Sequence, residues 1–94
     1  MISEKKSMQF LNVTASKQVA FGPGRLKGFV VDSTNVGTVK AWDSAVGAAG
    51  TVIFGTMTPA AGASINCFDL GFTNGLFLTI GGTALDLLVS YHPE

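Results

Sequence analysis

The chain has 94 residues, the length of one domain, and its 13% of charged residues is about half of the usual ~25%. Six basic and six acidic residues give no net charge, which excludes a strongly basic nucleic-acid-binding domain. The single cysteine excludes an internal disulfide. A small domain with so few charges must expose many small and apolar groups, and this favours a subunit of an assembly over a free monomer.

The chain begins with a polar stretch, and strand-like runs follow it. We expect residues 1–7 to form a flexible N-terminal arm and residues 8–94 to form a single β-sandwich domain. No apolar run follows the first charges, so we expect no secretory signal peptide. The uncharged stretch 44–68 contains Pro59 and four glycines, so we expect no membrane span there.

Short apolar runs, separated by glycine, proline and asparagine, predict β-strands along the whole chain. The predicted strands are residues 8–14, 18–21, 25–32, 38–44, 51–56, 63–68, 76–80 and 83–91. No window has the apolar spacing of an amphipathic helix. About eight short strands at this spacing predict an all-β fold, an antiparallel β-sandwich of jelly-roll or Greek-key type, and leave the connection order open.

Turn residues mark the ends of these strands. The Gly-Pro-Gly segment 22–24 predicts a tight turn, because glycine permits positive φ and proline fixes its own φ. The glycine pair at 81–82 predicts another turn. Residues 69–75, which end in Asn-Gly, predict a long corner.

The most regular stretch is residues 37–54, in which two β-like runs each begin with Gly-Thr-Val. Alternation in the first run places Val39 and Ala41 on one face, and Lys40 and Trp42 on the other. The second run alternates less clearly, so we expect it to be more buried. The stretch predicts a β-hairpin with a loop of several residues, and further strands must flank it because a lone hairpin is unstable in water.

Aromatic side chains are expected mainly in the core. All seven phenylalanines lie at strand positions or corners and are interpreted as core residues: Phe10, Phe21, Phe29, Phe54, Phe68, Phe72 and Phe77. We interpret Trp42 as a core residue with Lys40 at its edge, the alternative being an exposed aromatic that anchors a partner. We expect Cys67 to be a buried thiol. The last strand should turn Leu87 and Val89 inward, with Leu88 as the exception to the alternation.

No combination of residues predicts catalysis. His92, the single histidine, is expected in an exposed tail, which is a poor place for a preorganised base. Asp32, Asp43 and Asp69 adjoin turn residues and are expected to accept hydrogen bonds from local N–H groups. The glycine-rich segment 22–25 precedes a strand, whereas a phosphate site needs a helix N-terminus. We therefore expect no enzyme, with no catalytic residue, no metal and no cofactor.

Several segments together carry a resemblance to a known family. They are a glycine-rich turn with Gly-Arg-Leu (22–31), Gly-Thr-Val followed by Asp-Ser (37–44), Gly-Thr-Val-Ile (50–54), Asn-Gly-Leu (72–77) and a closing strand to Tyr91. This pattern covers nearly the whole chain from residue 22 onward. It resembles the small all-β, jelly-roll-like virion proteins of tailed bacteriophages, and is most similar to capsid decoration or cement proteins.

The resemblance implies a structural virion protein that binds the outer surface of a phage capsid and stabilises it. Its partner would be the major capsid protein or another virion protein, and it would form a homo-oligomer, a dimer or trimer. Neither nucleic acid nor membrane would be bound, and the protein would be located in the virion after assembly in the host cytoplasm. The possible partner contacts are Lys5, Lys6, Arg25, Lys40 and Trp42.

Three alternatives remain open at the level of sequence. The first is a phage tail or head-fibre component. The second is a carbohydrate-binding module of a virion that uses Trp42 and Tyr91 as a stacking platform. The third is a small hydrolase that uses the aspartates.

Overall fold

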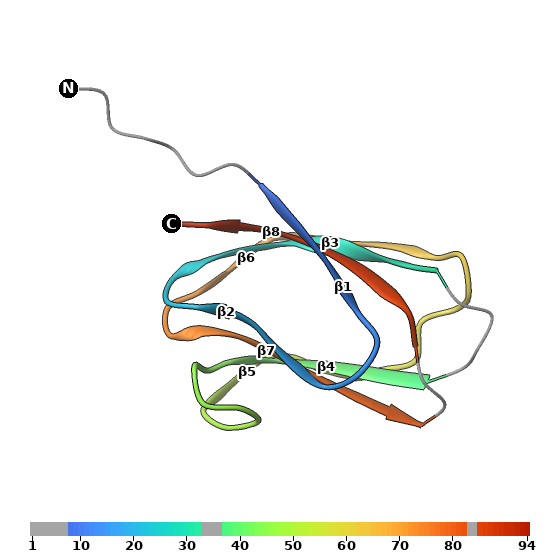
Figure 1. Cartoon of the computed structure of the whole chain (residues 1–94), viewed down its shortest axis with the longest axis horizontal. Coiled ribbons are helices and arrows are strands. Elements are labelled where there is room, and N and C mark those ends of the chain that lie inside the picture. The colour runs from blue at the N-terminus through green and yellow to red at the C-terminus, as the bar shows by residue number, and fades with distance from the viewer. Residues whose placement is uncertain (1–7, 33–36, 83–84) are drawn as a thin grey trace.

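A computed structural model describes residues 8–32, 37–82 and 85–94. They form eight β-strands: β1 (Gln9–Val13), β2 (Lys17–Phe21), β3 (Gly24–Val31), β4 (Gly37–Asp43), β5 (Thr51–Met57), β6 (Ser64–Phe72), β7 (Gly75–Gly82) and β8 (Leu87–Pro93). Two four-stranded sheets, with the orders β1-β8-β3-β6 and β2-β7-β4-β5, pack face to face (Figure 1). The predicted antiparallel β-sandwich is confirmed. Within the described ranges, no helix has the length and hydropathy to cross a membrane.

The strand order is that of one long hairpin rolled into two layers. Counted from the loop between β4 and β5, the chain pairs β4 with β5, β3 with β6, β2 with β7 and β1 with β8. Successive pairs fall in alternate sheets, and the β3–β8 and β4–β7 pairings complete each sheet. This arrangement is a jelly roll, so the structure supplies the connection order that the sequence left open.

The core is the apolar layer between the sheets. Most of its residues come from alternate positions of the strands in both sheets, while Val19 and Ala20 are adjacent at the irregularity of β2 and Leu85 precedes β8. The buried residues are Val13, Val19, Ala20, Leu26, Phe29, Val31, Val39, Ala41, Cys67, Phe72, Leu76, Leu78, Leu85, Leu87 and Val89. Val39 and Ala41 point inward from β4 as predicted, and the Cys67 thiol is buried as predicted. Leu87 and Val89 point inward from β8, while Leu88 points outward, which confirms the exception seen in the sequence.

The expectation that all seven phenylalanines belong to the core is wrong for several of them. Phe29 and Phe72 are buried, but Phe10, Phe21 and Phe68 are 61%, 76% and 81% exposed. Phe10 occupies an outward position of β1, because Leu11 and Val13 take the inward ones. Phe21 is the last residue of β2, at the end of the sandwich, where its side chain stays exposed.

Phe68 is exposed because β6 bulges outward. Phe68 and Asp69 both adopt left-handed backbone conformations, with φ of 54° and 59°. The pairing of β3 with β6 shifts between Leu26 opposite Leu70 and Gly28 opposite Asn66, so residues 67–69 face the single residue Lys27. The predicted corner at 69–75 is therefore wrong over most of its length, since β6 continues past this bulge to Phe72.

Two further predictions are corrected. Strand β5 was expected to be more buried than β4, but it contains no buried residue, because it is the edge of its sheet and pairs with β4 alone. The glycines at 81 and 82 were expected to form a turn, but they belong to β7 and pair with Thr38 and Gly37. The turn predicted at 22–24 is confirmed, and Gly22 has a φ of 83°.

Substitution of Gly28 tests how closely the backbones of β3 and β6 approach each other at the bulge. A Cβ at this position would overlap with the carbonyl oxygen of Ile65. We expect Gly28→Ala to lower the free energy of unfolding by roughly 1–3 kcal/mol, because the two backbones must separate. Gly55→Ala is the matched control, since nothing lies within 4 Å of its Cβ position, and it should change stability by less than ~0.5 kcal/mol. Urea unfolding measures both, and equal losses would contradict the close approach.

Candidate functional site

The residues predicted to contact a partner do not form one patch. Lys5 and Lys6 lie outside the described residues. Arg25 projects from β3 in the first sheet, where its Nε lies 3.6 Å from Oε2 of Glu94 and both side chains are about half exposed. Lys40 and Trp42 lie on β4 in the other sheet.

Trp42 lies on the outer face of the second sheet, so its interpretation as a core residue is wrong. Val39 and Ala41 fill the inward positions of β4, and the two-residue period then turns Trp42 outward. Its indole N–H donates a hydrogen bond to Oγ1 of Thr79 at 3.0 Å. The Nζ of Lys40 lies 4.4 Å from the centre of the ring, a cation–π contact. Both neighbours hold the half-buried ring in place.

The structure separates Trp42 from Tyr91. Tyr91 is on β8 in the first sheet and packs against the core, whereas Trp42 faces outward from the second sheet. The two rings therefore cannot form the shared stacking platform that the carbohydrate-binding hypothesis required.

One end of the sandwich gathers exposed apolar residues. We call it the loop end and define it by Phe21, Pro23, Val46 and the β4–β5 loop, residues 44–50. Phe21 is 76% exposed and Val46 is 83% exposed. The backbone joins these parts through Gly75, because Phe21 pairs with Gly75 and the N–H of Ser44 donates to the Gly75 carbonyl at 3.1 Å. Strand β1 begins and β8 ends here, on the left of Figure 1.

The β4–β5 loop is uncharged, and its polar groups are already bonded within the chain. Its sequence is Ser-Ala-Val-Gly-Ala-Ala-Gly. The N–H of Val46 donates to Oγ of Ser44 at 3.0 Å, and the N–H of Gly47 donates to Oε1 of Gln18 at 3.1 Å. The amide nitrogen of Gln18 in turn donates to the carbonyl of Ser44 at 2.5 Å. These bonds fix the loop on β2, so Val46 is held outward on a tethered backbone.

Asp43 ties the base of this loop to the corner between β6 and β7. Its Oδ1 accepts hydrogen bonds from the N–H groups of Thr73 and Asn74 at 3.0 and 2.7 Å. Its Oδ2 accepts one from the Thr73 hydroxyl at 3.1 Å. We expected an aspartate that bonds N–H groups near it in sequence; the acceptor role is confirmed, but the donors lie about thirty residues away.

The hydrogen bonds to Asp43 lower the pKa of its carboxyl group. Partial desolvation acts to raise the pKa, but hydrogen bonds from Asn74, Thr73 and Gly75 outweigh it and hold the pKa below its ordinary value of 3.8. The carboxylate therefore stays ionised and serves as a structural acceptor.

Asp69 and Asp86 also have partners within the chain, and His92 lies within a strand. Oδ1 of Asp69 lies 2.6 Å from Nζ of Lys27, whose hydrogen bond lowers the pKa of Asp69. Oδ1 of Asp86 accepts a hydrogen bond from Asn12 at 2.5 Å. His92 is part of β8 and is half-buried, so the expected exposed tail is wrong. Among the described residues, no three or more His, Cys, Asp or Glu side chains gather as metal ligands do.

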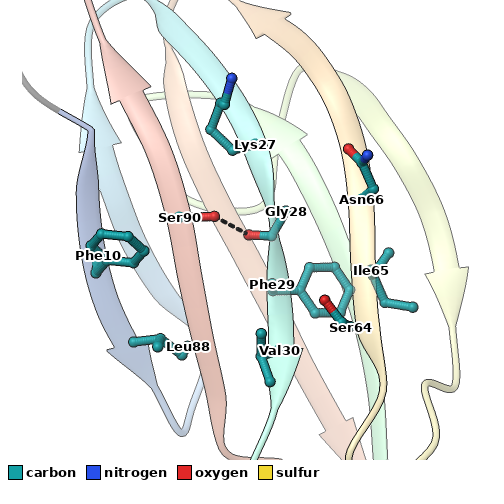
Figure 2. Close-up of a pocket in the computed structure, with 10 residues that line it drawn as sticks. All are labelled: Phe10, Lys27, Gly28, Phe29, Val30, Ser64, Ile65, Asn66, Leu88 and Ser90. Atoms are coloured by element: carbon teal, nitrogen blue, oxygen red, sulfur yellow. Dashed lines mark hydrogen bonds between the residues drawn. The ribbon is translucent and has the colours of Figure 1, made fainter.

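A shallow hollow of about 290 Å³ lies on the outer face of the first sheet (Figure 2). Gly28 lies at its centre, and Phe10, Val30 and Leu88 supply apolar walls. The Ser90 hydroxyl donates a hydrogen bond to the carbonyl of Gly28 at 3.2 Å. This face was not predicted from the sequence, although the glycine inside a strand and the outward Leu88 both indicated it.

Comparison with protein-family models, curated proteins and solved structures finds no match to this chain.

Asp43→Asn tests the tie between β4 and the β6–β7 corner. An amide in place of the carboxylate turns an NH₂ group toward N–H donors, so we expect the free energy of unfolding at pH 7 to fall by about 1–2 kcal/mol. Because folding lowers the pKa of Asp43, its contribution is fully present above pH 3.8 and is lost as pH falls through the folded-state pKa. The variant and the wild type should therefore converge in strong acid.

Urea unfolding between pH 7 and pH 2 measures this convergence. Asp32→Asn is the matched control, because the Asp32 side chain is exposed and follows the C-terminal end of β3, whereas the loop end lies at the N-terminal end of that strand. A difference between Asp43→Asn and wild type that stays constant across the whole pH range would refute the role of the ionised carboxylate.

Proposed function

We propose that this chain is a structural virion protein that binds the outer surface of a tailed-phage capsid through the loop end and stabilises the shell. The observation that carries a protein-binding role is the exposure of Phe21 and Val46 beside an uncharged loop. Exposed aromatic and aliphatic side chains that cluster on a small domain mark protein interfaces. The choice of a phage head as partner comes from the resemblance in the sequence.

The loop end suits a dry protein contact for a second reason. Docking is costly when polar groups lose water without gaining a partner. Here Ser44, the N–H of Gly47 and the Asp43 carboxylate already have partners inside the chain. Few polar groups would need new partners, and the apolar contacts would be gained on a backbone that is already held in position.

The stabilising effect would follow from mass action. A protein that binds the assembled shell, and not its free subunits, shifts the equilibrium toward assembly by RT ln(1 + [L]/Kd). No chemical step is needed. Arg25 lies at the same end of the sandwich, and its half-exposed side chain would add a contact to an acidic group beside the apolar centre.

Co-sedimentation with purified heads and purified tails of the encoding phage tests the proposal. We expect the wild-type chain to pellet with heads. Phe21→Gln and Val46→Asp should each weaken this binding by at least ~10-fold, because each removes an apolar anchor or adds a charge at the contact. Phe68→Gln is the matched control, since Phe68 is equally exposed but lies on the β6 bulge.

Each result discriminates between hypotheses. Binding to tails instead of heads would assign the chain to the tail. Loss of head binding in Phe68→Gln, with Phe21→Gln unaffected, would move the contact to the first sheet and overturn the role of the loop end. Circular dichroism of each variant confirms that the β-sandwich is retained.

A further inference from the structure

The outer face of the first sheet carries both a projection and a recess. We call it the β8 face and define it by Phe10, Gly28, Val30, Leu88 and Ser90. The Phe10 side chain is 61% exposed on β1, and the hollow over Gly28 lies on β3. We propose that the β8 face is a two-fold contact between two copies of this chain, in which Phe10 of each copy covers Gly28 of the other.

The strand register places these two features symmetrically about β8. Phe10 pairs with Ser90, and Gly28 pairs with the same Ser90. Phe10, Ser90 and Gly28 therefore form one row across β1, β8 and β3, with neighbouring strands ~4.8 Å apart. Phe10 on β1 and the hollow over Gly28 on β3 thus lie at equal distances on the two sides of β8.

A two-fold axis parallel to β8 would place the Phe10 side chain of each copy over the Gly28 hollow of the other copy. The axis lies between the two facing sheets and runs parallel to β8. A half-turn about it exchanges the β1 side and the β3 side of the face, while each residue keeps its position along the strand direction. It brings β1 of one copy over β3 of the other, so both Phe10 rings reach a Gly28 hollow. Such self-complementarity is what a two-fold interface requires. Leu88, in the next row of β8, faces its own symmetry mate.

The charges around this face also favour a second copy over a charged partner. Lys27 is bonded to Asp69 at 2.6 Å, and Arg25 lies 3.6 Å from Glu94. Among the residues that the structure describes, these two positive side chains near the face each have a negative neighbour in their own chain. Two identical faces can therefore meet without placing unmatched like charges against each other, an arrangement that would weaken the contact.

The size of the face sets the strength of the contact. Four strands ~4.8 Å apart and about seven residues at ~3.3 Å make a face of roughly 440 Å². Stable interfaces cover about 800 Å² on each partner. We therefore expect a weak, reversible dimer, of the kind that small interfaces form.

Sedimentation velocity of the full chain, from 5 μM to 1 mM and without heads, tests the inference. The wild type should shift from monomer to dimer across this range. Phe10→Gln should weaken the dimer by at least ~10-fold, because it removes the residue that fills the hollow. Phe21→Gln is the matched control and should dimerise like the wild type, since Phe21 lies at the loop end.

A charge-swap pair tests the two-fold axis itself. In Leu88→Lys or Leu88→Asp alone, like charges would face each other across the axis, and both variants should stay monomeric. A mixture of equal amounts should form a dimer, because a lysine then faces an aspartate. A wild type that remains monomeric at 1 mM, or a mixture that does not associate, would overturn the inference. Because no heads are present, this outcome is independent of the proposed capsid binding.

Discussion

The apolar layer between the two sheets determines which side chains remain available for function. Leu26, Val39, Leu78 and Val89 from the four central strands are almost completely buried there. Because side chains alternate along a strand, fixing these four inward fixes their neighbours outward. A shift by one residue would bury Trp42 and Leu88 and expose the core, so the register is strongly specified. The β8 face is therefore a consequence of the same packing that holds the fold together.

Polar bonds hold the loop end where the apolar layer stops. Asp43 joins β4 to the corner at Thr73 and Asn74, and Gln18 joins β2 to the β4–β5 loop. Each of these bonds links segments from different strand pairs of the long hairpin. They fix the position of the β4–β5 loop relative to Phe21. The exposed apolar side chains at this end are thus supported by hydrogen bonds beneath them, which limits the entropy that binding would cost.

The eight strands were predicted from the alternation of apolar and polar residues and from turn residues, because both signals depend only on residues that are close in sequence. The outward phenylalanines were not predictable in this way, because β1 carries apolar residues on both faces and its phase depends on pairing with β8, far along the chain. The bulge at Phe68 and Asp69 uses positive φ without glycine, and its turn-forming residues Asn66 and Asp69 do not distinguish a bulge inside a strand from the corner that was predicted. Asp43 was identified as an acceptor, but its donors are brought to it only by the folded corner.

The direction of the proposed two-fold axis connects the two proposed surfaces. An axis along β8 runs along the strands, so it leaves both copies with their loop ends pointing the same way. A dimer would then offer Phe21 and Val46 twice, side by side, to one flat partner such as a capsid shell. When two sites are linked, the second binds at an effective concentration that reaches millimolar values. A self-contact too weak to persist in dilute solution would therefore still form between two copies seated next to each other. The contact between two copies through the β8 face and the contact of each loop end with the shell would in this way strengthen each other.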